Sequence, residues 1–132
     1  MAPSATPRIV VVDDSKEVTD YVLRLLKEQG IEGWAVNDPL QTAKVADQVR
    51  PDLVILDFNM PKLLGPELAA LLKTSPAMKD VPILFLSGMT EKVHKDLAAY
   101  CGAAAYLEKP INSTKLIHSV YQLLQTRKSR PS

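Results

Sequence analysis

The chain has 132 residues, the length of one domain, which is enough for a buried core but leaves little room for a second fold. Apolar residues make up 46% and charged residues 23%, which excludes a disordered polar chain. With 16 basic and 15 acidic residues the formal charge is +1, so no overall field attracts nucleic acid or an anionic membrane.

The sequence also has features that bear on its location. No apolar run is long enough to cross a membrane, and the first residues lack the regions of a signal peptide. The single Cys101 has no partner for an internal disulfide, which fits a reducing compartment. We therefore expect a cytoplasmic protein with neither membrane nor direct nucleic acid binding.

Short, continuous apolar runs alternate with stretches of helical periodicity, a pattern typical of parallel strands that are buried on both faces. In the first part of the chain, a strand is expected at 9–12 and a helix from residue 14 to Gly30, which supplies its end. A weaker strand follows at 34–36. The next helix is expected to begin at Asp38 as capping residue and to end near Val49.

The second part of the chain repeats this alternation. Three further strands are expected, at 53–57, 82–87 and 104–107. Three further helices are expected, from Gly65 to the cluster at 74–76, from Thr90 to Tyr100, and from Asn112 or Ser113 to the residues before Thr126. The last helix places several leucine, isoleucine and valine side chains on one stripe, which predicts that this face is buried.

Five repeats of strand and helix predict a flavodoxin-like (βα)5 fold. This is an α/β, doubly wound, parallel five-stranded sheet with strand order 2-1-3-4-5. We expect the domain at 8–126, with an N-terminal tail at 1–7 and a C-terminal tail at 127–132. In such sheets, ligands bind beyond the carboxyl ends of the strands.

Chemically active side chains follow four of the five expected strands. They are Asp13 and Asp14 after the first, Asp57 after the third, Ser87 after the fourth and Lys109 after the fifth. The pair Asn37-Asp38 after the second strand is assigned to helix capping. Three carboxylates packed together repel, so at neutral pH they need a cation or strongly raised pKa values. Oxygen ligands with open positions favour Mg²⁺, and a lysine ammonium could hold an anionic group beside the ion.

These residues, in this order, resemble the receiver domains of two-component response regulators. The matching segments are Val12-Asp13-Asp14-Ser15, Asp57-Phe58-Asn59-Met60-Pro61 with Gly65 and Glu67, Ser87-Gly88, and Tyr106-Leu107-Glu108-Lys109-Pro110. One segment alone is weak evidence, but all four at strand ends are highly specific. The resemblance covers nearly the whole chain.

The resemblance implies that Asp57 is a phosphoacceptor. A sensor histidine kinase or a histidine phosphotransfer protein would supply the phosphoryl group from a phosphohistidine. Mg²⁺, or Mn²⁺ in its place, is expected to bind Asp14, Asp57 and the backbone carbonyl of Asn59 directly, and Asp13 largely through water. A carboxylate is a weak nucleophile, so cations must neutralise the charge that develops on the phosphoryl oxygens.

The resemblance also implies how the signal is transmitted. Lys109 would pair with the phosphoryl oxygens, Ser87 would donate a hydrogen bond to one of them, and Tyr106 would rotate to report the change. The Lys109-Pro110 bond resembles the cis peptide of the family. The expected output surface is the fourth helix, the fifth strand and the fifth helix, facing a downstream protein or a second copy. Candidate contacts there are Lys92, Lys95, Glu108 and Ile111.

Several of these residues have plainer interpretations. Asp13 and Asp14 could only cap the first helix, Ser87 before a glycine is common loop chemistry, and Tyr106 could simply pack. His94 and His118 lie on expected helices without ligand partners at metal-site spacing, and we expect both to be exposed.

Three alternative functions share this architecture. A phosphatase of the haloacid dehalogenase type also uses a strand-end aspartate, but it needs a second aspartate where this chain has Asn59. A flavodoxin-like carrier of FMN needs a hydroxyl- and glycine-rich phosphate loop after the first strand, where this chain has two acids. A module used only for binding would not need every residue of an acceptor site. We therefore expect a regulatory domain that promotes only its own phosphorylation and dephosphorylation.

Overall fold

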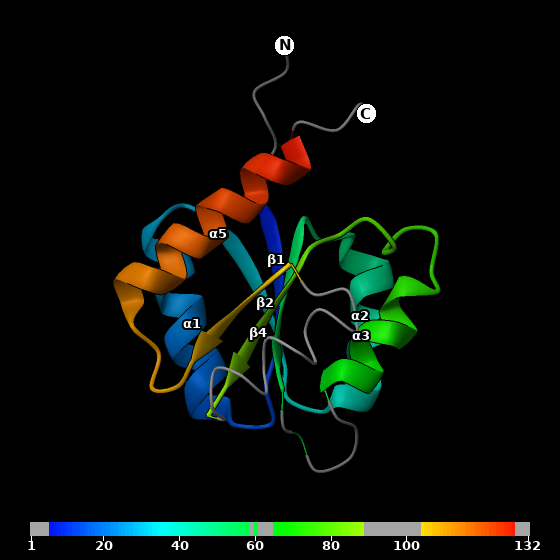
Figure 1. Cartoon of the computed structure of the whole chain (residues 1–132), viewed down its shortest axis with the longest axis horizontal. Helices are drawn as coiled ribbons and strands as arrows, with labels where there is room; N and C mark the ends of the chain where they lie inside the picture. Colours follow the sequence, from blue (N-terminus) through cyan, green and yellow to red (C-terminus); the bar gives the residue numbers. More distant parts are fainter. Residues whose placement is uncertain (1–5, 59, 61–64, 89–103, 129–132) are drawn as a thin grey trace.

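The computed structural model describes residues 6–58, 60, 65–88 and 104–128. Within them, five parallel strands form one sheet in the order β2-β1-β3-β4-β5 (Figure 1). The strands are β1 Arg8–Val12, β2 Glu32–Val36, β3 Leu53–Asp57, β4 Ile83–Ser87 and β5 Ala105–Glu108. The predicted fold and strand order are therefore confirmed.

Helices cover both faces of the sheet. They are α1 Lys16–Glu28, the short 3-10 helix η1 Pro39–Gln41, α2 Thr42–Val49, α3 Gly65–Lys73 and α5 Ser113–Lys128. Figure 1 shows α1 and α5 on one face of the sheet, and α2 and α3 on the other. The helix predicted at 90–100, together with His94 and Cys101, lies outside the described residues.

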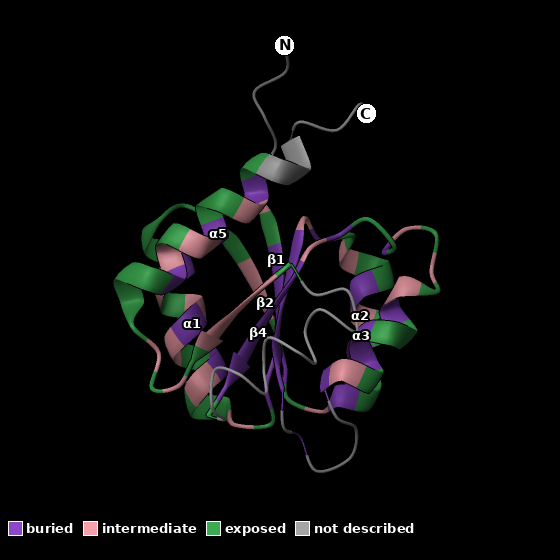
Figure 2. Cartoon of the chain, in the orientation of Figure 1, coloured by how far each residue is buried: buried purple, intermediate pink, exposed green. Residues whose placement is uncertain are grey.

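The alternation of side chains along β1 divides the core into two layers. Ile9 and Val11 point to the side of α1 and α5, while Val10 and Val12 point to the side of α2 and α3. All four side chains are fully buried, as are the four apolar residues of β3. In Figure 2, buried positions gather on the central strands β1, β3 and β4, and exposed positions follow the outer sides of the helices. This two-sided burial explains why the strands read as continuous apolar runs.

Local signals position the ends of the elements. Ser15 is the N-cap of α1, because its side chain accepts a hydrogen bond from the backbone N–H of Val18 over 3.3 Å. Gly30, with φ of 73°, follows the end of the same helix, as predicted. In the same way, Asn112 caps α5 through a 3.0 Å bond from the N–H of Lys115. The cis peptide bond at Lys109-Pro110 is also present.

Some element boundaries differ from the prediction. β2 begins at Glu32, two residues before the predicted start, because its pairing with β1 includes Arg8 and Ile9. The helix predicted from Asp38 begins as η1 and becomes α-helical only at Thr42. α5 continues to Lys128, beyond the predicted end of the last helix.

Candidate functional site

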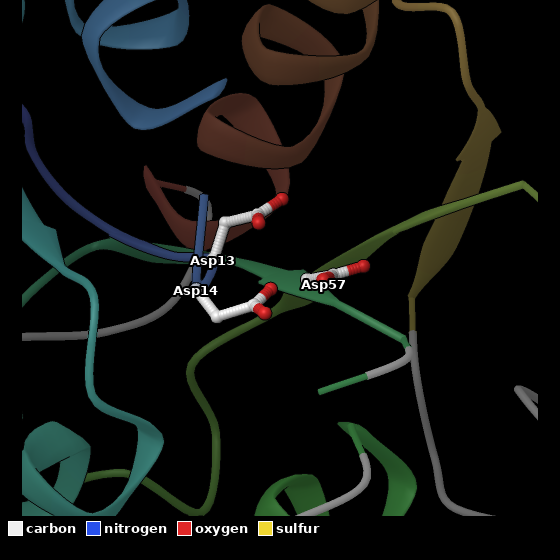
Figure 3. A group of neighbouring side chains, drawn as sticks. All are labelled: Asp13, Asp14 and Asp57. Carbon is white, nitrogen blue, oxygen red and sulfur yellow. The ribbon is translucent and has the colours of Figure 1, made fainter. Parts of the chain in front are cut away.

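Three carboxylates lie together at the carboxyl ends of β1 and β3. Figure 3 shows Asp13 and Asp14 on the segment after β1, beside Asp57 at the last position of β3. Each residue offers one carboxylate oxygen, and these oxygens all lie within 4.8 Å of one another. Asp13 and Asp57 are only 1% and 4% exposed, whereas Asp14 is exposed. The cluster is therefore closed on the side of the sheet and open to solvent at Asp14.

Lys109 bridges the two buried carboxylates from the residue directly after β5. Its Nζ lies 3.0 Å from Oδ2 of Asp13 and 3.2 Å from Oδ1 of Asp57. The backbone N–H of Lys109 donates to the carbonyl of Ser87 over 2.7 Å, which fixes the lysine beside the end of β4. Partial burial lowers the pKa of Lys109, but hydrogen bonds and the charges of Asp13 and Asp57 outweigh this effect and raise it. The ammonium group therefore stays charged at neutral pH.

The charges and ligand atoms of this cluster fit a hard divalent cation. Three carboxylates and one ammonium leave two uncompensated negative charges when all of them are ionised. The available atoms are oxygens, which Mg²⁺ prefers, and the exposed side leaves room for water or phosphate oxygens. The donor set therefore fits the predicted ion. The predicted ligand carbonyl of Asn59 lies outside the described residues.

Asp13 is held by hydrogen bonds from several elements. Its backbone N–H donates to the carbonyl of Val36 at 3.1 Å, and its Oδ1 accepts from the backbone N–H of Ser15 at 2.9 Å. Its backbone carbonyl accepts from Nδ2 of Asn37 at 2.8 Å. These bonds, with the one from Lys109, fix both the backbone and the carboxylate of Asp13. The interpretation of Asp13 as only a helix cap is therefore insufficient, because the N-cap of α1 is Ser15.

Sequence reasoning missed the contribution of Asn37 to this site. The capping assignment is correct for Asp38, whose side chain accepts from the backbone N–H of Leu40 at 3.1 Å. For Asn37 it is wrong, because that side chain donates to Asp13 and to Oγ1 of Thr19. The available signal was its position at the carboxyl end of β2, the strand that pairs with β1.

The residues predicted to sense phosphorylation lie on β4 and β5. Ser87 ends β4, is 1% exposed, and pairs in register with Glu108. Tyr106 is half-buried on β5 and packs against the core cluster on the side of α2 and α3. His118 is exposed on α5, as predicted.

Gly65 brings the start of α3 against the residues at the end of β3. Its backbone N–H donates to the carbonyl of Phe58 over 2.9 Å. A Cβ at this position would lie 2.6 Å from the carbonyl oxygen of Asp57 and 2.8 Å from Cα of Phe58. Because both neighbours are backbone atoms, only glycine permits this approach.

Comparison with known proteins identifies the family. Residues 9–121 match the family described as "Response regulator receiver domain". The chain therefore belongs to the response regulator receiver domain family.

Among curated proteins, Protein RcaC of Microchaete diplosiphon is 32% identical over 93% of this chain and 19% of that protein. The transcriptional regulatory protein PrrA of Mycobacterium leprae is also 32% identical, over 93% of this chain and 52% of PrrA. The chain thus spans about half or less of the length of these relatives.

Solved structures agree with this assignment. The chemotaxis protein CheY4 of Vibrio cholerae superposes with a TM-score of 0.86 at 28% identity, over 90% of this chain and 99% of CheY4. The receiver domain of the sensor histidine kinase PA1611 from Pseudomonas aeruginosa has a TM-score of 0.82, covering 92% of this chain and 99% of that one. Its identity is 21%, so it shows the fold alone; that structure has a magnesium ion coordinated in its active site cleft.

The family assignment gives the class of function. The chain is a receiver domain of two-component signalling, a regulatory phosphoacceptor domain rather than a true enzyme. The cluster of Asp13, Asp14 and Asp57 is typical of a phosphoacceptor site. Membership of this family excludes the haloacid dehalogenase-type phosphatase and the flavodoxin-like FMN carrier as alternatives. Among the described residues, no helix is both long and apolar enough to span a membrane.

Proposed function

We propose that Asp57 accepts a phosphoryl group from a phosphohistidine. The phosphorus–nitrogen bond of the donor breaks, its electron pair stays with the imidazole, and a carboxylate oxygen of Asp57 bonds to phosphorus. The observation that carries this proposal is the grouping of three carboxylate oxygens within 4.8 Å, with a lysine bridging two of them. Asp57 ends a fully buried strand, which supports its role as a rigidly positioned nucleophile.

The same proposal assigns the cation site. Asp14, Asp57 and the carbonyl of Asn59 would hold Mg²⁺ directly and Asp13 would hold it through water, with Mn²⁺ as an alternative ion. When bound, the ion would neutralise charge on the phosphoryl oxygens. The exposure of Asp14 supports direct binding at the open side of the cluster, where a phosphate donor can approach.

Two further residues would act on the phosphoryl group. Lys109 has three N–H donors, two of which are used by Asp13 and Asp57, so a third can donate to a phosphoryl oxygen. Ser87 would donate from its hydroxyl to another oxygen, and this new contact would shift the conformation of Tyr106. Support for this coupling comes from the backbone bond between Lys109 and Ser87, which joins the ends of β4 and β5.

The partners follow from these roles. The donor would be a sensor histidine kinase or a histidine phosphotransfer protein, acting in the cytoplasm. The output would be a downstream protein or a second copy, bound through the face formed by the fourth helix, β5 and α5, without direct nucleic acid contact. An open pocket of about 560 Å³ beside β5 and the first turn of α5, lined by residues such as Tyr106, Glu108 and Lys115, supports that choice. We assign this function to the predicted domain at 8–126, although its last helix, α5, continues two residues further to Lys128.

Incubation with acetyl phosphate and Mg²⁺ tests the proposal. The mass should increase by one phosphoryl group, and the Asp57→Asn variant should show no increase. Beryllofluoride with Mg²⁺ should change the association state or the tyrosine environment in the wild-type protein alone. A wild-type mass that never changes, with the ion present, would contradict the proposed function.

A further inference from the structure

The side chain of Asn37, the residue directly after the edge strand β2, is connected to the acidic cluster through backbone atoms. Nδ2 of Asn37 donates to the carbonyl of Asp13 over 2.8 Å and to Oγ1 of Thr19 over 3.0 Å. Thr19 is fully buried, and its hydroxyl donates to the carbonyl of Lys16 over 3.1 Å. One amide group therefore joins the ends of β1 and β2 to the first turn of α1.

Two hydrogen bonds fix the two peptide units that flank Asp13. The unit before it is held by its N–H, which donates to the carbonyl of Val36 over 3.1 Å. The unit after it, which leads into Asp14, is held by its carbonyl, which accepts from Asn37. Because a peptide unit is planar, holding its oxygen sets the direction in which the chain enters Asp14.

The direction of Asp14 matters because this carboxylate is exposed and lies beside two others. Like charges repel, so without a fixed backbone the Asp14 side chain would favour conformations that point away into water. Ordering it again on ion binding would lower the affinity. Asp13 has additional anchors in Ser15 and Lys109 and depends less on this contact.

We propose that Asn37 is a positioning residue for the cation site. It orients the Asp13–Asp14 peptide so that the carboxylate of Asp14 faces those of Asp13 and Asp57 before an ion binds. The residue touches neither the phosphoryl group nor the ion, so it acts through the backbone alone. This inference rests on the proposed function, since it requires that the cluster binds a divalent cation.

Calorimetric titration with Mg²⁺ tests the inference on the full chain. Asn37→Ala should weaken Mg²⁺ binding on the order of tenfold, as is usual when the support of a metal ligand is removed. Asn37→Ser, whose side chain is too short to reach both acceptors, should show a similar loss and provides a second variant. Asp38→Ala is the matched control, because it removes a hydrogen bond from the same loop without touching Asp13. Its affinity should equal that of the wild-type protein.

Two further readouts separate positioning from general stability. Thermal unfolding in EDTA should differ little between Asn37→Ala and Asp38→Ala, because Asn37 is exposed and Asp38 half-buried, so neither truncation leaves a cavity in the core. In acetyl phosphate reactions, Asn37→Ala should need more Mg²⁺ for half-maximal rate and should regain the wild-type rate at saturating Mg²⁺.

Equal Mg²⁺ affinity in Asn37→Ala and wild-type protein would overturn the positioning role while leaving the proposed function intact. A wild-type protein that binds no Mg²⁺ would overturn the proposed function itself.

Discussion

The strand that ends in Asp57 and the strand that directly precedes Lys109 differ sharply in their surroundings. β3 lies between β1 and β4, and all five of its residues are buried. β5 is the last strand of the sheet, with three half-buried residues and an exposed Glu108. The proposed nucleophile therefore ends a strand that is buried along its whole length, whereas the lysine that faces it follows a partly exposed strand at the edge of the sheet. Moving a strand costs less free energy when the strand buries less apolar surface. β5 is therefore better suited than β3 to move in response to phosphorylation.

The largest effect on stability should come from truncating β3. Ile55→Ala removes a fully buried side chain, so the free energy of unfolding should fall by about 2–5 kcal/mol. Leu107→Ala on β5 is the matched change at a half-buried position, and it should lower this free energy by about 1 kcal/mol. Urea denaturation measures both values. Equal losses would show that the two strands are anchored alike.

The next largest effect should come from removing the ammonium group of Lys109, and it concerns the rate of phosphorylation. In Lys109→Met the phosphoryl oxygens lose a preorganised donor, so the rate with acetyl phosphate should fall about a hundredfold. Lys115→Met is the control, because Lys115 is exposed on the neighbouring first turn of α5. A Lys109→Met rate close to that of the wild type would mean that the bridge is only structural.

The contact between α3 and β3 can be tested at a glycine. Gly65→Ala would bring Cβ to 2.6 Å from the carbonyl oxygen of Asp57, so the backbone must shift, and stability should fall by about 1–3 kcal/mol. Gly88→Ala serves as control, because a Cβ there meets no atom of the described part of the chain within 4 Å. Chemical denaturation of both variants checks this prediction. Similar stability of the two would indicate that α3 does not need its close approach to β3.

The smallest effect should appear as a dependence of stability on alkaline pH. The pKa of Lys109 is raised in the folded protein, because its partners outweigh the burial that lowers it. Its stabilising contribution is therefore complete below the ordinary lysine pKa and is lost as the pH rises through the folded value. The free energy of unfolding of the wild type should fall more steeply in this range than that of Lys109→Met. Parallel curves would show that Lys109 contributes nothing to this dependence.

The boundaries of strands that are buried along their whole length were predictable from the sequence. The boundaries of strands that contain both buried and exposed residues were less predictable. The boundaries of β3 agree with the prediction because four apolar residues precede a single carboxylate. The start of β2 was missed because exposed Glu32 and the glycine after it interrupt the apolar pattern. Leu71 on α3 is 52% exposed although its type suggests burial, because it faces away from the sheet.

The site was predictable where side chains follow strands, because parallel strands bring their carboxyl ends to one edge. That rule brought together Asp13, Asp14, Asp57 and Lys109. It did not reveal the role of Asn37, because its partner is a backbone carbonyl 24 residues away that only the pairing of β1 with β2 brings close.

Locating the phosphoryl group is the most direct measurement of the account. The protein would be treated with acetyl phosphate and Mg²⁺, the acyl phosphate reduced with borohydride to homoserine, and the modified residue identified by tandem mass spectrometry. We expect the modification at Asp57, with none at Asp13 or Asp14, and its loss when EDTA removes the ion. Modification of Asp13 or Asp14 instead, or equal labelling with and without Mg²⁺, would contradict the assignment of nucleophile and cation ligands.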